Sequence, residues 1–248
     1  LMATVKPLAD TPANVGAGLL DVGRAVSQQV RADVGSLSFG LLEWPHTKTF
    51  TKTITYSNAS AQPVSLALQH DLGADFAVPA SVTVPAGGSA AVDVVLDPRK
   101  GNGKFFGRIK ASGGDVSLTT AVGAYVQEER RTLTLSMIGR DGKPVPDEFV
   151  VLVNMATQEA SSLSIVDGVG SARMGVGDYA VLGRIDEKTP NYAWFSPVSA
   201  TEVAGRVSLT ADTTITLDAR QGKQISVKFP ETGSEVWYRA ADLRVPWK

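Results

Sequence analysis

Residues 81–96 read Ser-Val-Thr-Val-Pro-Ala-Gly-Gly-Ser-Ala-Ala-Val-Asp-Val-Val-Leu, and this stretch decides the fold class. Residues 81–84 alternate in polarity, and every second residue from 90 to 96 is apolar. Because successive side chains of a strand point to opposite faces, both segments are typical of half-buried β-strands. Residues 85–88 between them form a turn, since glycine adopts positive φ without a steric penalty.

The same alternation continues on both sides of this stretch. The segments that show it are 36–39, 49–56, 64–68, 105–111 and 116–125. Their short length and regular spacing predict an immunoglobulin- or fibronectin-like β-sandwich over residues 32–127.

A second unit is expected over residues 128–221, again all-β. Residues 131–138 alternate, and the apolar run 149–153 is typical of a strand buried on both faces or in a sandwich core. Residues 170–174 and 178–182 are expected to pair as a hairpin around Gly175-Val176-Gly177. Residues 222–248 are read either as the start of a further β module or as a tail packed on the second sandwich.

Residues 1–31 differ from the rest because they are helix-prone and broken by prolines and glycines. Asp21 has the side chain of a helix N-cap, since its carboxylate can accept the free N–H groups of the first turn. This stretch is read as a helical arm packed on the following domain, or as the last piece of a larger α/β domain. The predicted fold class is therefore mainly β, with two tandem Ig/fibronectin-like β-sandwiches after a short N-terminal helical segment.

Composition excludes several classes of function. The 248 residues carry a formal net charge of -1, which gives no electrostatic footprint for nucleic acid or an anionic membrane. No apolar run reaches 18 residues, so no membrane span is predicted. Because cysteine is absent, a disulfide framework and a Cys-ligated metal site are excluded.

The sequence predicts no catalytic residue and no cofactor. The two histidines, His46 and His70, lack a paired nucleophile motif and are interpreted as surface or loop residues. The acidic pairs Glu128-Glu129 and Asp186-Glu187 lack the spacing of an EF-hand and are interpreted as solvated charge. A structural calcium ion in a loop is the alternative.

Two short motifs concern binding and modification. Asn58-Ala59-Ser60 is a formal glycosylation sequon, and its place at a predicted turn favours a hydrogen-bonded Asx turn instead. Tyr192, Trp194 and Phe195 form a candidate carbohydrate- or protein-binding patch, with core or interdomain packing as the alternative.

Several stretches resemble one protein family. Residues 1–8, LMATVKPL, followed by residues 16–26, GAGLLDVGRAV, resemble the end of a subtilisin-like serine peptidase domain. Tyr56-Ser57-Asn58 and residues 82–89, VTVPAGGS, are similar to the fibronectin-like domain that follows the catalytic domain in large secreted bacterial subtilases. Residues 213–220, TTITLDAR, resemble the close of the next β-domain in actinobacterial members. The second unit is more loosely similar to transthyretin- or carboxypeptidase-regulatory-like sandwiches.

The resemblance implies an accessory, non-catalytic region of a secreted or cell-surface bacterial serine endopeptidase. Residues 1–31 would be the C-terminal remnant of the peptidase domain, with the family's Asp, His and Ser triad upstream of Leu1, so that the chain alone is inactive. The implied partners are that catalytic domain in cis and protein substrates. Gly16, Gly18, Asp21 and Ala25 match family positions that serve as turn, cap and helix packing.

Gly23 departs from the pattern and should weaken the last helix by roughly 0.5–1 kcal/mol relative to alanine. This hypothesis therefore expects residues 1–31 to be poorly ordered or to expose apolar surface. The alternative function is a tandem Ig-like adhesion or carbohydrate-binding module, which would use the aromatic residues around Trp194.

Overall fold

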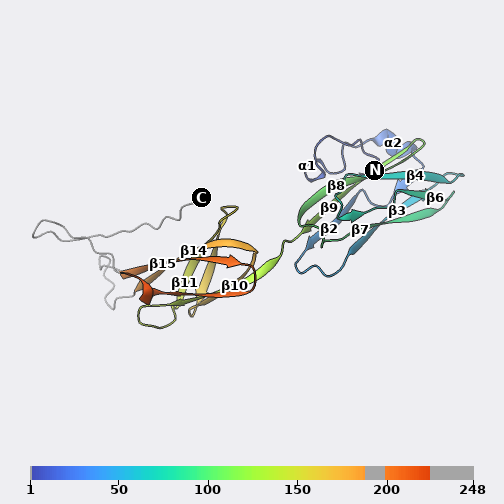
Figure 1. Cartoon of the computed structure of the whole chain (residues 1–248). Helices are drawn as coiled ribbons and strands as arrows, with labels where there is room; N and C mark the ends of the chain where they lie inside the picture. Colours follow the sequence, from blue (N-terminus) through green and yellow to red (C-terminus); the bar gives the residue numbers. More distant parts are fainter. Residues whose placement is uncertain (1, 188–198, 224–248) are drawn as a thin grey trace, which may run out of the picture. The chain divides into compact units, whose positions relative to one another are not determined.

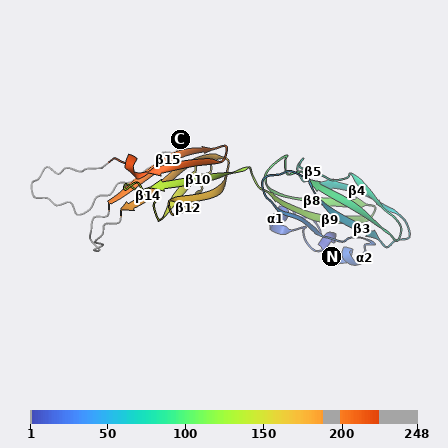
Figure 2. The same ribbon diagram turned by 90° about the horizontal axis from the view of Figure 1, so that it is seen from below.

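The computed structural model describes residues 2–187 and 199–223, and it confirms the mainly-β fold class (Figures 1 and 2). The chain divides into two compact units, Leu1–Glu128 and Glu129–Lys248, which we call unit 1 and unit 2. Each unit has its own cluster of buried hydrophobic side chains.

Unit 1 is a sandwich of two sheets. All neighbouring strands are antiparallel except β2 and β9, which run parallel. In order across the four-stranded sheet, the strands are β1 (Val30–Ala32), β3 (Phe50–Asn58), β7 (Ser89–Leu96) and β5 (Phe76–Ala77). In order across the five-stranded sheet, they are β2 (Ser36–Leu42), β9 (Val116–Val126), β8 (Gly103–Gly113), β4 (Val64–His70) and β6 (Ser81–Val84).

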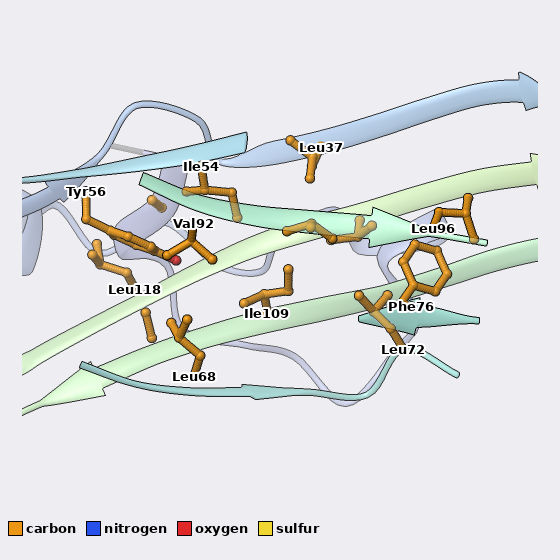
Figure 3. Close-up of a cluster of buried hydrophobic side chains, with 14 of the residues drawn as sticks. Leu37, Ile54, Tyr56, Leu68, Leu72, Phe76, Val92, Leu96, Ile109 and Leu118 are labelled. Atoms are coloured by element: carbon orange, nitrogen blue, oxygen red, sulfur yellow. The ribbon is translucent and has the colours of Figure 1, made fainter. Parts of the chain in front are cut away.

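The core of unit 1 lies between the inner faces of these two sheets. Figure 3 shows side chains from both sheets, among them Ile54, Val92, Ile109 and Leu118, pointing toward one another. The alternation of residues 90–96 is confirmed, because Val92, Val94 and Leu96 are buried while Asp93 is exposed. Fully burying one such side chain contributes about 1.5–3 kcal/mol.

Unit 2 places seven strands in one continuous sheet whose two halves share a core. β10 and β16 are parallel, and the other pairs are antiparallel. The two halves join at β12 and β13, which are paired only at their hairpin, Val166 with Val169. Across the core, the methyl end of Met137 on β10 lies close to Gly183 on β14. In order across the sheet, the strands are β15 (Ser199–Leu209), β14 (Gly177–Glu187), β11 (Asp147–Asn154), β12 (Ala160–Val166), β13 (Val169–Gly175), β10 (Arg130–Ile138) and β16 (Thr213–Asp218).

The hairpin predicted between residues 170–174 and 178–182 is wrong. β13 pairs with β10 and β12, whereas β14 pairs with β11 and β15. The intervening residues cross from one half of the sheet to the other, and the Val176 N–H donates to the carbonyl of Glu129 (3.1 Å). Alternation predicts which face of a strand is buried but does not say which strand lies beside it.

The apolar run 149–153 belongs to a sandwich core and is not buried on both faces. Val150 and Leu152 are fully buried, but Phe149 is 62% exposed. The sequence pattern does not predict β12 as a strand. Its residues 160–162 are Ala-Ser-Ser, and only Leu163 and Ile165 point into the core.

Asn58 forms the predicted Asx turn and is buried, at 2% exposure. Its Oδ1 accepts the Ser60 N–H (2.9 Å), and its Nδ2 donates to the carbonyls of Gln62 (2.8 Å) and Val84 (3.3 Å). The side-chain amide of the formal sequon is therefore engaged in joining the end of β3 to the turn after β6.

Replacing Asn58 with alanine should lower the free energy of unfolding by about 2–4 kcal/mol, because several buried backbone groups lose their partner. Urea unfolding of the full chain measures the change. Asn102→Ala, at an exposed loop position, is the matched control and should change stability by less than about 0.5 kcal/mol. A loss no larger in Asn58→Ala than in the control would contradict the structural role of Asn58.

Tyr56 is fully buried on β3, and burial, with a smaller contribution from Asp33, raises its pKa to about 12. In an unfolded chain the pKa of a tyrosine is about 10. Between these two values the unfolded chain has lost the phenolic proton and the folded chain retains it. Stability should therefore fall by roughly 2–3 kcal/mol as the pH rises from 10 to 12.

Urea unfolding of the wild type and Tyr56→Phe at pH 7, 8, 9, 10, 11 and 12 isolates this dependence. The difference in unfolding free energy between the two proteins should change across pH 10–12 and stay constant below pH 9. Parallel pH profiles for the two proteins would show that Tyr56 titrates as an ordinary tyrosine.

Candidate functional site

Residues 2–28, which we call the N-terminal segment, lie on the outer face of the five-stranded sheet of unit 1 (Figures 1 and 2). A 3-10 turn, η1 (Met2–Thr4), contacts β9, and α1 (Pro12–Val15) contacts both β8 and β9. Ala3, Thr4 and Val5 are buried, which anchors the start of the segment. The segment therefore packs on the domain that follows it.

A pair of hydrogen bonds closes the loop between η1 and α2 (Val22–Ser27). The Lys6 N–H donates to the Leu19 carbonyl (2.8 Å), and the Leu19 N–H donates to the Lys6 carbonyl (2.9 Å). Gly18 has a φ of 138°, and a Cβ there would lie 2.2 Å from the Lys6 oxygen. Residues 16–17 form a turn, and Gly18 is required by the close approach of the two backbones.

Asp21 is the N-cap of α2, as predicted. Its Oδ1 accepts the backbone N–H of Arg24 at 3.0 Å. This hydrogen bond lowers the pKa of the Asp21 carboxyl, and the nearby charges of Lys6 and Arg24 lower it further against the opposing effect of desolvation. Asp21 Oδ2 lies 3.8 Å from Lys6 Nζ and 3.9 Å from Arg24 Nη2. The capping residue therefore also forms ion pairs with Lys6, before the loop, and with Arg24 of α2.

Gln28 attaches the end of the segment to the sheet, a role that no sequence pattern indicates. Its buried side chain donates from Nε2 to the Val30 carbonyl (2.8 Å) and accepts the Ser117 N–H of β9 on Oε1 (3.1 Å). The bond to Ser117 spans 89 residues of sequence, and glutamine at a helix end is common. A single sequence therefore carries no signal for it.

The side of the segment that faces away from the sheet is apolar. Val22 and Val26 are 56% and 77% exposed and lie four residues apart on α2, so they share one face. Leu19 and Leu20, just before the cap, are also more than half exposed. We call these four side chains the apolar surface, and they show the apolar exposure expected for residues 1–31.

The predicted aromatic patch, Tyr192, Trp194 and Phe195, lies outside the described residues. His46 lies in a loop, where its Nε2 is 2.7 Å from the Gln127 carbonyl and its ring packs edge-on against Trp44. His70 is exposed at the end of β4. Within the described ranges neither histidine is hydrogen-bonded to a serine or threonine.

Over residues 2–187 and 199–223, no group of three or more His, Asp or Glu side chains could hold a metal ion. In that part of the chain, no helix is long and apolar enough to cross a membrane.

Comparison with known proteins finds no matching family model and no matching curated protein. Among solved structures, a Porphyromonas gingivalis protein of unknown function is 19% identical over 39% of this chain and 46% of its own (TM-score 0.33). PapD-like domain 7 of human CEP192 is 18% identical over 50% and 94% (TM-score 0.35). The VesB protease of Vibrio cholerae is 20% identical over 42% and 34% (TM-score 0.31). The chain thus spans less than half the length of the first and third, and these values identify no family.

Gln28→Ala should lower the unfolding free energy by about 1–3 kcal/mol, because the Ser117 N–H loses its partner. It should also increase amide hydrogen exchange at Lys6 and Leu19, since the end of the segment is released. Gln29→Ala, with its exposed side chain, is the matched control. Equal exchange at Lys6 in both variants would show that Gln28 does not hold the segment.

Proposed function

We propose that this chain is the non-catalytic accessory region of an exported bacterial subtilisin-like serine endopeptidase. In this proposal the N-terminal segment bears against the catalytic domain, and the β units brace that domain and position protein substrates. The observation that carries it is the apolar surface of Leu19, Leu20, Val22 and Val26, which is exposed on a segment that is itself attached to unit 1.

The way the segment is held supports a binding role. α2 has only six residues and contains Gly23, so it would not be stable alone. The Asp21 cap, the Lys6–Leu19 hydrogen bonds and Gln28 fix it without covering its apolar face. A surface ordered before binding loses less conformational entropy when a partner covers it.

An accessory role places the catalytic triad in the peptidase domain and not in this chain. Hydrolysis by a subtilisin-like serine peptidase requires a histidine within hydrogen-bond reach of the nucleophile. Neither His46 nor His70 makes such a contact in the part of the chain that the structure describes. The triad would therefore come from the catalytic domain, and purified 248-residue chain should not hydrolyse casein.

Binding to the catalytic domain of a secreted bacterial subtilase, with its nucleophile blocked, tests the contact. Titration should give saturable binding to the wild type. Val22→Ser and Val26→Ser should each weaken it by roughly ten-fold, because each removes a methyl-rich side chain from the buried contact. Val166→Ser, at a valine of unit 2 that is 58% exposed, should leave the affinity unchanged.

Three results would count against this function. They are casein hydrolysis by the purified chain, an absence of binding, and equal weakening by Val22→Ser and Val166→Ser. The first would show that a catalytic site exists in the chain. The other two would show that the apolar surface is not the contact.

A second candidate is a tandem Ig-like adhesion or carbohydrate-binding module. Supporting it, Leu41, Phe106 and Tyr125 are exposed on the neighbouring strands β2, β8 and β9, where Leu41 and Tyr125 are register partners. Phe106→Ala or Trp194→Ala should then abolish a glycan-array signal. A blank array for the wild type would eliminate the carbohydrate-binding version.

A further inference from the structure

A cleft of about 260 Å³ lies on the five-stranded sheet of unit 1, beside the N-terminal segment. Pro7 lines it from the segment, and β4, β8 and β9 line it from the sheet. Gln69, Lys110 and Thr119 are register partners across these three adjacent strands. Directly opposite residues share one face of a sheet, so the three side chains form a row along the cleft.

Charges at the cleft favour an anion. Arg108 is two residues from Lys110 on β8 and therefore lies on the same face. Its guanidinium is fixed by donation from Nη2 to the Asp10 carbonyl (2.7 Å). Asp71 is the one carboxylate that lines the cleft, and its Oδ1 already accepts the backbone N–H of Arg108. Lys110 and Arg108 thus place two permanent cations beside a single carboxylate.

Two polar atoms at this place have no hydrogen-bond partner among the described residues. Thr119 is 1% exposed, and its hydroxyl is buried and unpaired. The Nε–H of Arg108 is also buried and unpaired. Buried polar groups are nearly always paired, so these two unpaired groups mark the part of the sheet beside the cleft as one where an anion or a water would complete the hydrogen bonding.

We propose that this cleft binds a small oxyanion, namely a phosphate or carboxylate group. Lysine, arginine, a glutamine amide and a threonine hydroxyl all supply donors, and charge-assisted hydrogen bonds to oxyanions are stronger than neutral ones. The volume is below the range of about 300–1,000 Å³ found for sites of drug-sized ligands, so it suits a head group. This inference uses a different part of unit 1 from the apolar surface and does not depend on the proposed peptidase context.

NMR titration of the ¹⁵N-labelled full chain tests the site, with sodium phosphate and sodium acetate as probes. Sodium chloride at matched ionic strength is the control for screening. Phosphate or acetate should produce saturable shifts of the Gln69, Lys110 and Thr119 amides, with a dissociation constant on the order of 1 mM. The stronger of the two probes identifies which oxyanion the cleft prefers.

Variants separate a site from general surface charge. Lys110→Gln and Thr119→Val should each weaken binding by roughly ten-fold, since each removes a donor to the anion. Lys110 is exposed, so its replacement leaves the core intact. Lys104→Gln changes an exposed lysine on the same face of β8 outside the cleft, and binding should stay within about two-fold of wild type.

The proposal is overturned if both probes give only linear shifts equal to those of chloride. It is equally overturned if Lys110→Gln and Thr119→Val bind as tightly as Lys104→Gln. In that case Thr119→Val should simply raise the melting temperature, as expected when an orphan hydroxyl is replaced by a methyl group of the same shape.

Discussion

The burial of β9 on both faces is the constraint on which unit 1 depends. Leu118 and Val122 point into the sandwich core, while Thr119 and Ala121 point outward and are nevertheless buried. In an antiparallel sheet, one face usually contacts water. Because the outward side chains of β9 are buried, another part of the chain must pack on them. The N-terminal segment is that cover, and Gln28 fastens it to β9 itself. The segment is therefore part of the folded unit, and its loss would expose the middle of the sheet.

Both surfaces that we propose as binding sites on unit 1 adjoin this covering layer. Once one side of the segment is used to bury β9, its other side presents Val22 and Val26 to the surroundings. Where Pro7 of the segment borders the sheet, polar residues of β4, β8 and β9 line a cleft. The apolar surface and the cleft thus differ in chemistry because one belongs to the segment and the other to the sheet.

The alternation of single strands was predictable from the sequence, and their arrangement was not. Residues 90–96 alternate so regularly that the pattern predicts the buried face of β7. The residue types of Asp21 and Gly18 likewise predict a helix cap and a turn. The hairpin at residues 170–182 failed because the chain there crosses between the halves of one sheet. The cleft was equally hidden, since the row of Gln69, Lys110 and Thr119 exists only through the pairing of three strands. The register between strands that are far apart in the sequence depends on the tertiary structure, so a local sequence pattern does not predict it.

Amide hydrogen exchange of the full chain tests most directly the claim that the N-terminal segment is a structural layer of unit 1. The account predicts that the N–H groups of Lys6 and Leu19 exchange slowly, with protection approaching that of Ile54 in the core strand β3, because they open only when the cover is lost. Exchange of Lys6 and Leu19 at unfolded-chain rates, while β3 and β9 stay protected, would contradict it.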